Sequence, residues 1–260
     1  MDLGISGKLA LVCAASKGIG RAAAFSLAKE GVNLVLTARD AAALEETASD
    51  ISRKTDATVL CFPADLTSRS DRARLAAAHS NIDILIANPG TPQRFADFQT
   101  MTREEREWWM EAHFYSMIEL IQASTAGMVQ RKFGRIVNVS VNFIKFPQAH
   151  AGHSHAARLA LAGAASALAK ELAPHNVTIN SVLPGPINTE ALRGALQRRA
   201  AAQGVSYEQV ASGVLKNCPA GRFSEPEETG DLIAMLCAAQ MGFVTGQNIT
   251  NDGGAYPGLF

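Results

Sequence analysis

Residues 9–21 read L-A-L-V-C-A-A-S-K-G-I-G-R. The aliphatic run at its start is typical of a buried strand, and the alanine-rich segment that follows is typical of a helix. Between the two, Gly18 and Gly20 allow a tight turn and let a pyrophosphate approach the positive end of the helix. This order of strand, turn and helix predicts a dinucleotide-binding unit near the start of the chain.

Strand and helix patterns alternate along the rest of the chain. Short aliphatic or β-branched runs predict strands at residues 9–13, 33–37, 58–63, 82–88, 135–139 and 178–183. Longer segments predict helices at residues 19–30, 41–55, 68–79, 103–131 and 154–172, with further helical pieces at 192–203 and 207–216. The alternation predicts an α/β fold, a Rossmann-like doubly wound parallel sheet in a single domain over residues 1–260.

Charge and composition restrict the possible partners. The 24 Lys and Arg residues balance the 24 Asp and Glu residues, so no overall field attracts nucleic acid or an anionic membrane, and we expect a small-molecule substrate. No basic segment precedes an apolar core at the start, and no apolar run approaches the ~20 residues that span a bilayer, which predicts a cytoplasmic protein. The four cysteines lack C-x-x-C spacing, so neither a disulfide framework nor a metal site is expected.

Three further motifs carry a family resemblance. The runs R-I-V-N-V-S (135–140), A-A-R-L-A-L-A-G (156–163) and N-S-V-L-P-G-P-I-N-T (180–189) resemble the short-chain dehydrogenase/reductase family, in particular its 3-oxoacyl-ACP reductase-like members. The resemblance implies an oxidoreductase that acts with a nicotinamide cofactor on a small carbonyl or alcohol substrate. It also implies a homo-oligomer, either a dimer or a tetramer, and a substrate lid at residues 188–220.

The resemblance also indicates which residues bind the cofactor. Arg39 stands where many NAD-binding relatives carry an acidic residue, and together with Lys17 it suits a 2′-phosphate, so NADP(H) is favoured over NAD(H). Ala14 replaces a glycine of the family pattern and is strained if its φ is positive. The full predicted set is Ser16, Lys17, Gly18, Ile19, Gly20, Arg39, Asp65, Leu66, Asn88, Gly90, Arg158, Pro184, Gly185, Ile187 and Thr189.

The residues at the family's catalytic places differ from its Asn-Ser-Tyr-Lys set. The tyrosine and lysine places hold Ser154 and Arg158, the serine place falls on Val141, and the asparagine place falls on His113. A serine hydroxyl is a far weaker acid than a phenol, and a guanidinium cannot lose its proton at working pH. Strand alternation leads us to expect that Ser140 points away from the site unless the strand bulges.

Histidines are concentrated near the predicted pocket, and one of them could supply the proton that tyrosine normally donates. They are His113, His150, His153 and His155. For His113 we favour a hydrogen-bonded core histidine, and the others are also compatible with exposed loop or capping residues. The spacing H-x-x-H-x-H has no nearby carboxylate or cysteine, so zinc is not expected. The predicted catalytic residues are Ser154, Arg158, His113 and His153.

Three functional hypotheses remain open. The first is an atypical NADP(H)-dependent oxidoreductase in which Arg158 holds the ribose and the substrate oxygen, while water or a histidine donates the proton. The second is non-redox chemistry on the same scaffold, as in a lyase, dehydratase or cyclase. The third is a catalytically silent NADP(H)-binding subunit that uses the alanine-rich helix at 156–173 to pack against a copy of itself. The identity of the substrate is not predicted.

Overall fold

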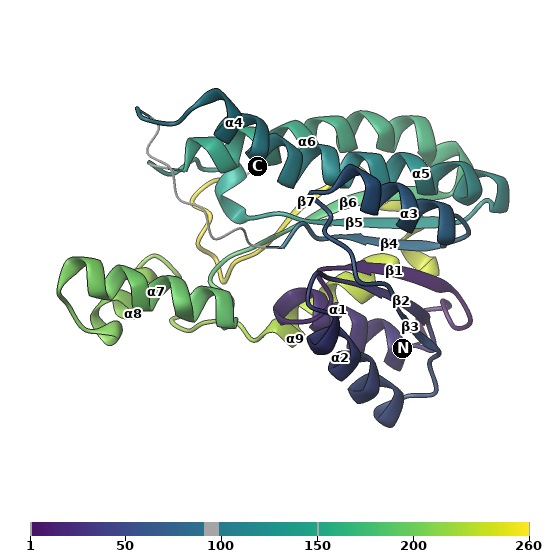
Figure 1. Cartoon of the computed structure of the whole chain (residues 1–260), viewed down its shortest axis with the longest axis horizontal. Helices are drawn as coiled ribbons and strands as arrows, with labels where there is room; N and C mark the ends of the chain where they lie inside the picture. The colour runs from purple at the N-terminus through teal and green to yellow at the C-terminus, as the bar shows by residue number, and fades with distance from the viewer. Residues whose placement is uncertain (1, 91–98, 150, 260) are drawn as a thin grey trace.

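The computed structural model describes residues 2–90, 99–149 and 151–259. All of its strands run parallel in one sheet, in the order β3-β2-β1-β4-β5-β6-β7 (Figure 1). The strands are β1 (Leu9–Cys13), β2 (Asn33–Thr37), β3 (Val59–Cys61), β4 (Ile84–Ala87), β5 (Gly134–Val139), β6 (Val177–Pro184) and β7 (Asn248–Asn251). The strand order reverses between β1 and β4, so the carboxyl ends of these strands border the crevice where a doubly wound fold binds its ligand.

Helices cover both faces of this sheet and bury it (Figure 1). On one face, α1 (Gly18–Lys29), α2 (Ala41–Lys54) and α9 (Pro226–Cys237) contribute to a core with Val12, Leu34 and Val137. On the other, α3 (Arg69–Ala78), α5 (Ser116–Arg131) and α6 (Gly152–Leu172) contribute to a core with Leu11 and Ile136. Burial on both sides explains why the strands read as continuous apolar runs, and the predicted fold class is confirmed.

The single helix predicted at 103–131 is interrupted. It divides into α4 (Arg103–Met110), a π-helical turn η1 (Glu111–Tyr115) and α5. The almost fully buried Arg72 of α3 holds this turn through ion pairs with Glu111 (2.6 Å) and Glu119 (2.8 Å). The apolar periodicity continues through the turn, so the sequence pattern did not reveal it, although π turns occur often at functional sites.

Two elements were missing from the sequence prediction. Strand β7 is N-I-T-N, a half-exposed strand at the edge of the sheet without an aliphatic run. Helix α9 does carry a start signal, with Pro226 in its first turn and a capping box between Glu225 and Glu228. It fills the face beside α1, against which it packs. The other predicted strands and helices are confirmed, with small shifts at their ends.

Residues 188–220 contain α7 (Glu190–Gln203) and α8 (Tyr207–Leu215), which project from the body as a helical pair (Figure 1). The two helices pack on each other through a small core of their own that includes Leu196, Ala200 and Val210. The pair therefore has a core separate from the two that flank the sheet. Within the described residues, no helix is long and apolar enough to cross a membrane.

Candidate functional site

The glycine turn after β1 has the shape needed by a phosphate. Gly18 has a φ of +56°, and a side chain at Gly20 would lie 2.2 Å from the carbonyl oxygen of Ala14, so neither position accepts another residue without strain or rearrangement. Helix α1 starts after Lys17 without a side-chain cap, which leaves its first N–H groups available to an anion. The turn therefore fits a pyrophosphate.

Ala14 meets the condition for strain set by the sequence, because its φ is positive. Its φ is +50°, one of three positive values among the non-glycine residues that the structure describes. On the side of Gly90 its methyl group has room, because even a side chain added at Gly90 would be 3.5 Å away. The strain is therefore in the backbone, and the turn keeps its shape despite the extra β-carbon.

The structure brings the predicted cofactor residues to one edge of the sheet. Residues 16–20 follow β1, Arg39 follows β2, Asp65 and Leu66 follow β3, Asn88 and Gly90 follow β4, and Pro184, Gly185, Ile187 and Thr189 end or follow β6. The Asp65 carboxylate accepts hydrogen bonds from the backbone N–H (2.9 Å) and hydroxyl (2.8 Å) of Thr67. Asn88 accepts one from the Gly90 N–H at 3.1 Å.

The two cationic residues predicted to bind a 2′-phosphate, Arg39 and Lys17, differ in whether they form an ion pair. Arg39 is exposed and forms no ion pair with a described residue. Lys17 forms an ion pair with Glu190, the first residue of α7, at 3.0 Å, and this contact raises the pKa of Lys17. Within the described part of the chain, Arg39 therefore has no ion pair to break before it binds a phosphate, whereas Lys17 is paired with Glu190 of α7.

Ser154 and Arg158 lie one turn apart on α6 and touch. The Nε–H of Arg158 donates to Ser154 Oγ at 3.3 Å. Burial lowers the pKa of Arg158 to about 10, so the guanidinium is still charged at neutral pH. Because the serine oxygen accepts this bond, its own proton is free to donate elsewhere. The pair combines a hydroxyl donor with a fixed positive charge.

His113 corrects one interpretation of the sequence. It lies in η1, is fully buried, and stacks on Trp109 of α4 with ring centroids 5.3 Å apart. Neither ring nitrogen has a hydrogen-bond partner among the described residues, so it is not a satisfied core histidine. Burial, followed by the charge of Arg158, lowers the pKa of His113 to about 2. At neutral pH it can offer an N–H donor, but it cannot act as a charged acid.

The other histidines of α6 lie beside the same rings. His153 is partly buried and tilts against Trp109 at 4.5 Å between centroids, and burial lowers its pKa. His155 is buried near Phe143, with its Nδ1 unpartnered, and burial, Arg158 and His153 together lower its pKa. His150 lies outside the described residues. Chain folding thus gathers His113, His153 and His155 around Arg158, although adjacent residues on α6 do not face one another.

Ser140 is a candidate that the sequence interpretation missed. Its hydroxyl is buried and has no partner among the described residues. Ile136 packs against α5 and α6, whereas Val137 and Val139 pack against the opposite core, and the Ser140 N–H continues the ladder to the Val182 carbonyl. By alternation from Ile136, Ser140 lies on the α5 and α6 side, opposite Val139. Counting alternate residues from Ile136 would have shown this.

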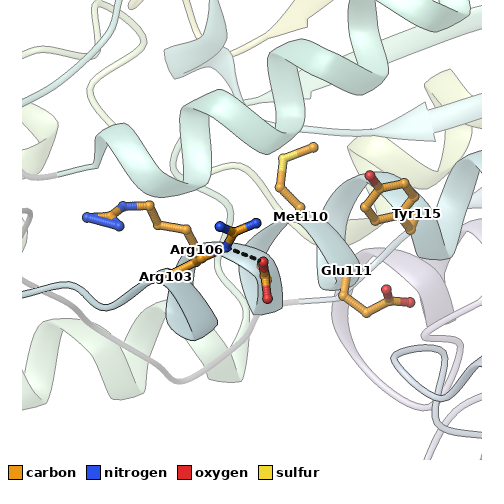
Figure 2. Close-up of a pocket in the computed structure, with 6 residues that line it drawn as sticks. Arg103, Arg106, Met110, Glu111 and Tyr115 are labelled. Atoms are coloured by element: carbon orange, nitrogen blue, oxygen red, sulfur yellow. Dashed lines mark hydrogen bonds and ion pairs between the residues drawn. The ribbon is translucent and has the colours of Figure 1, made fainter.

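Two pockets lie outside this group of residues. One of about 520 Å³ runs along α4 and η1, lined by Arg103, Arg106, Glu107, Met110, Glu111 and Tyr115 (Figure 2). None of the predicted catalytic residues lines it. Another of about 310 Å³ is lined in part by Ile187, Cys218 and Asp252, beside the end of β6. Among the residues described, no cluster of three or more His, Cys, Asp or Glu could hold a metal ion.

Comparison with known proteins agrees with this arrangement. The family profile described as enoyl-(acyl carrier protein) reductase matches residues 13–256. The NADPH-dependent reductase BacG of Bacillus subtilis (strain 168) is 30% identical over 262 aligned residues, covering 96% of this chain and 98% of BacG. The 3-oxoacyl-[acyl-carrier-protein] reductase FabG of Haemophilus influenzae (strain ATCC 51907 / DSM 11121 / KW20 / Rd) is 28% identical over 256, covering 97% and 99%.

Among solved structures, the L-sorbose reductase from Gluconobacter frateurii, complexed with NADPH and L-sorbose, superposes with a TM-score of 0.93 at 26% identity. The alignment covers 100% of each chain. These relatives match the chain from end to end, so the likeness extends over the glycine turn, the sheet edge and the segment that carries α7 and α8.

Proposed function

Because the chain belongs to the short-chain dehydrogenase/reductase family, we propose that it is an NADP(H)-dependent oxidoreductase for a small carbonyl or alcohol substrate that works without the family's tyrosine and lysine. The observation that carries this proposal is the fit of the glycine turn to a pyrophosphate, with an unpaired Arg39 next to it. Two relatives support the choice of cofactor, since BacG is named as NADPH-dependent and the sorbose reductase was solved with NADPH.

When bound, NADPH supplies a hydride to the substrate carbon. The protein then has to stabilise the negative charge that develops on the substrate oxygen. Ser154 donates its free hydroxyl proton to that oxygen as a hydrogen bond, and Arg158 lowers the cost of the charge with its guanidinium. The two remaining nitrogens of Arg158 have donors left for the ribose hydroxyls.

The proton that completes the reaction comes from water. Ser154 is too weak an acid to replace a phenol, and His113 is neutral at neutral pH because burial lowers its pKa to about 2. His153, which is partly exposed, is placed to pass a proton between solvent and the site. We therefore assign His113 to hydrogen bonding and His153 to proton exchange.

A stopped-flow experiment tests the proposal. Protein is first shown by calorimetry to bind NADPH and is then mixed with NADPH and a panel of small ketones, aldehydes and keto acids. We expect oxidation of NADPH with at least one class of substrate, and loss of that oxidation in Arg158→Met. Tight NADPH binding with no oxidation across the panel would refute hydride transfer and leave non-redox chemistry or the silent subunit.

The unpartnered nitrogens of His113 favour a second candidate, non-redox chemistry such as a dehydration or a retro-aldol cleavage. In that reaction the neutral imidazole of His113 relays a proton, accepting it at one nitrogen while donating from the other, and Arg158 anchors the substrate. Product analysis after incubation without any nicotinamide separates the two candidates, because only the non-redox enzyme forms product there.

We also propose a homo-oligomer, a dimer or a tetramer, in the cytoplasm. The outer face of α6 carries small residues and the exposed Leu159, and Tyr115 of η1 is likewise exposed. Small side chains allow two helices to approach closely, which supports α6 as part of an isologous contact. Analytical ultracentrifugation showing only monomer at micromolar concentration would rule this assembly out.

A further inference from the structure

The chain pairs its other buried guanidinium groups internally. Arg72 forms ion pairs with Glu111 and Glu119 and donates to the Leu66 carbonyl at 2.7 Å. Arg135 donates to backbone carbonyls of Ala238, Ala239, Gly134 and Asn176 and to the Asn176 side chain. In both cases the donors that burial removes from water are satisfied by the protein.

Arg158 differs from both. Among the described residues its one hydrogen bond is the 3.3 Å contact from Nε to Ser154, and no carboxylate pairs with it. Its surroundings have lowered its pKa to about 10 through burial alone, with no acidic group opposing the shift. A partly buried cation whose terminal nitrogens have no protein acceptor is costly to maintain and is a usual means of holding an anionic ligand.

The histidines beside Arg158 are also potential hydrogen-bond donors, and no described carboxylate accompanies them. His113 has two buried nitrogens and His155 one buried nitrogen without a partner among the described residues. The groups that influence the ionisation of His113, His153 and His155 are Arg158, the histidines themselves and burial, and no carboxylate takes part. The rings packed around them, Trp109 and Phe143, are uncharged. Among the described residues, the cluster formed by these three histidines, Ser154 and Arg158 therefore has no carboxylate as a counter-ion.

We propose that this cluster binds a carboxylate of the substrate, so that the substrate class is a keto acid or the corresponding hydroxy acid rather than a neutral ketone or alcohol. The proposal rests on the oxidoreductase function above. Each terminal nitrogen of Arg158 carries two N–H groups, so one from each can form the planar fork that matches a carboxylate, and the others remain for the ribose. The histidine N–H groups supply further donors. The aromatic rings of Trp109 and Phe143 suit an apolar or aromatic body beside the acid.

Calorimetric titration tests the proposal without turnover. The protein is saturated with NADP⁺, which cannot deliver a hydride, and titrated with phenylpyruvate or with phenylacetone, in which a methyl group replaces the carboxylate. We expect phenylpyruvate to bind at least about tenfold more tightly, since a hydrogen bond to a charged group contributes ~1.5–3 kcal/mol. Equal affinities for the two ligands would overturn the proposal.

Matched variants show whether the preference is local. Arg158→Met should reduce the affinity ratio to about one, whereas Arg69→Met, which removes the same charge from an exposed site on α3, should leave it unchanged. Arg158→Lys keeps the charge without the fork and should give an intermediate ratio; it also tests the proposal if Arg158→Met does not fold. A preference that survives in Arg158→Met, or that Arg69→Met removes equally, would refute the assignment.

The number of protons taken up when the ligand binds provides a second measurement. A bound carboxylate raises the pKa of His153 and His155, so phenylpyruvate should bind with proton uptake and phenylacetone without it, as measured in buffers of different ionisation enthalpy. The outcomes also separate this proposal from the proposed function. Binding of phenylpyruvate through Arg158 without any NADPH oxidation would refute only the oxidoreductase, and reduction of phenylacetone as efficiently as phenylpyruvate would refute only the carboxylate site.

Discussion

Replacing Ala14 by glycine should stabilise the protein, although it removes a side chain. With φ at +50°, an L-residue costs ~1–2 kcal/mol that glycine does not. Against this, glycine gives the unfolded chain more conformational freedom than alanine does, which lowers the stability of the variant by ~0.5–1 kcal/mol. The methyl is only partly buried and its loss costs little. The net gain is about 0.5–1 kcal/mol, a rise in Tm of roughly 1–3 °C for a chain of this size.

The stability change is measured by urea unfolding of the apo protein, together with thermal scans. Two control variants separate relief of backbone strain from loss of a buried methyl group. Ala15→Gly removes a fully buried methyl next door, at a residue without positive φ, and should destabilise by about 1 kcal/mol or more. Lys132→Gly relieves another positive φ, at the exposed end of α5, and should stabilise like Ala14→Gly. If Ala14→Gly destabilises as Ala15→Gly does, the turn is not strained and our description of it is wrong.

Three further substitutions test the site. Arg39→Ala should weaken NADPH binding roughly tenfold and leave NADH binding unchanged in fluorescence titrations, because the 2′-phosphate alone distinguishes the two; equal weakening would contradict its role. Burial lowers the pKa of His113 from 6.5 to about 2 in the folded protein. As the pH falls below 6.5, the unfolded chain takes up a proton that the folded protein does not, so the free energy of unfolding decreases. Between pH ~6.5 and ~4.5 the free energy of unfolding of the wild type should fall by about 2 kcal/mol more than that of His113→Asn. If the two proteins lose stability in parallel over this pH range, this role of His113 is wrong. Ser140→Ala removes a buried, unpartnered hydroxyl, so stability should hold or rise. Turnover should fall about tenfold if that hydroxyl contacts the substrate oxygen, and unchanged kcat and KM would restrict Ser140 to packing.

The sequence predicted the framework well because the framework depends on local patterns. Strands β1 and β2 end at the predicted residues, since apolar runs buried on both faces are easy to recognise. The motif identified Ala14 as the residue where a positive φ would cause strain, and the structure gives it that φ. Strand β7 was missed because an edge strand of N-I-T-N needs no aliphatic run, and its place depends on pairing with β6.

The chemistry of the site was less predictable because it depends on contacts between distant segments. The missing partners of His113 become visible only when η1 is packed against α6. The ion pair between Lys17 and Glu190 joins residues far apart in sequence, so a motif-based interpretation could not predict that α7 contacts this cation. The side on which Ser140 lies could have been obtained from alternation, but only with a neighbour of known orientation.

The most direct test of the central claim, hydride transfer without the family's phenol, is a single turnover with NADPH deuterated at its transferable position. Wild-type protein is mixed with the labelled cofactor and phenylpyruvate, and the hydroxy acid is examined by mass spectrometry. We predict one deuterium at the carbinol carbon of the product, and no labelled product from Arg158→Met. Consumption of phenylpyruvate to any product that carries no deuterium, at the same rate with and without NADPH, would contradict the account.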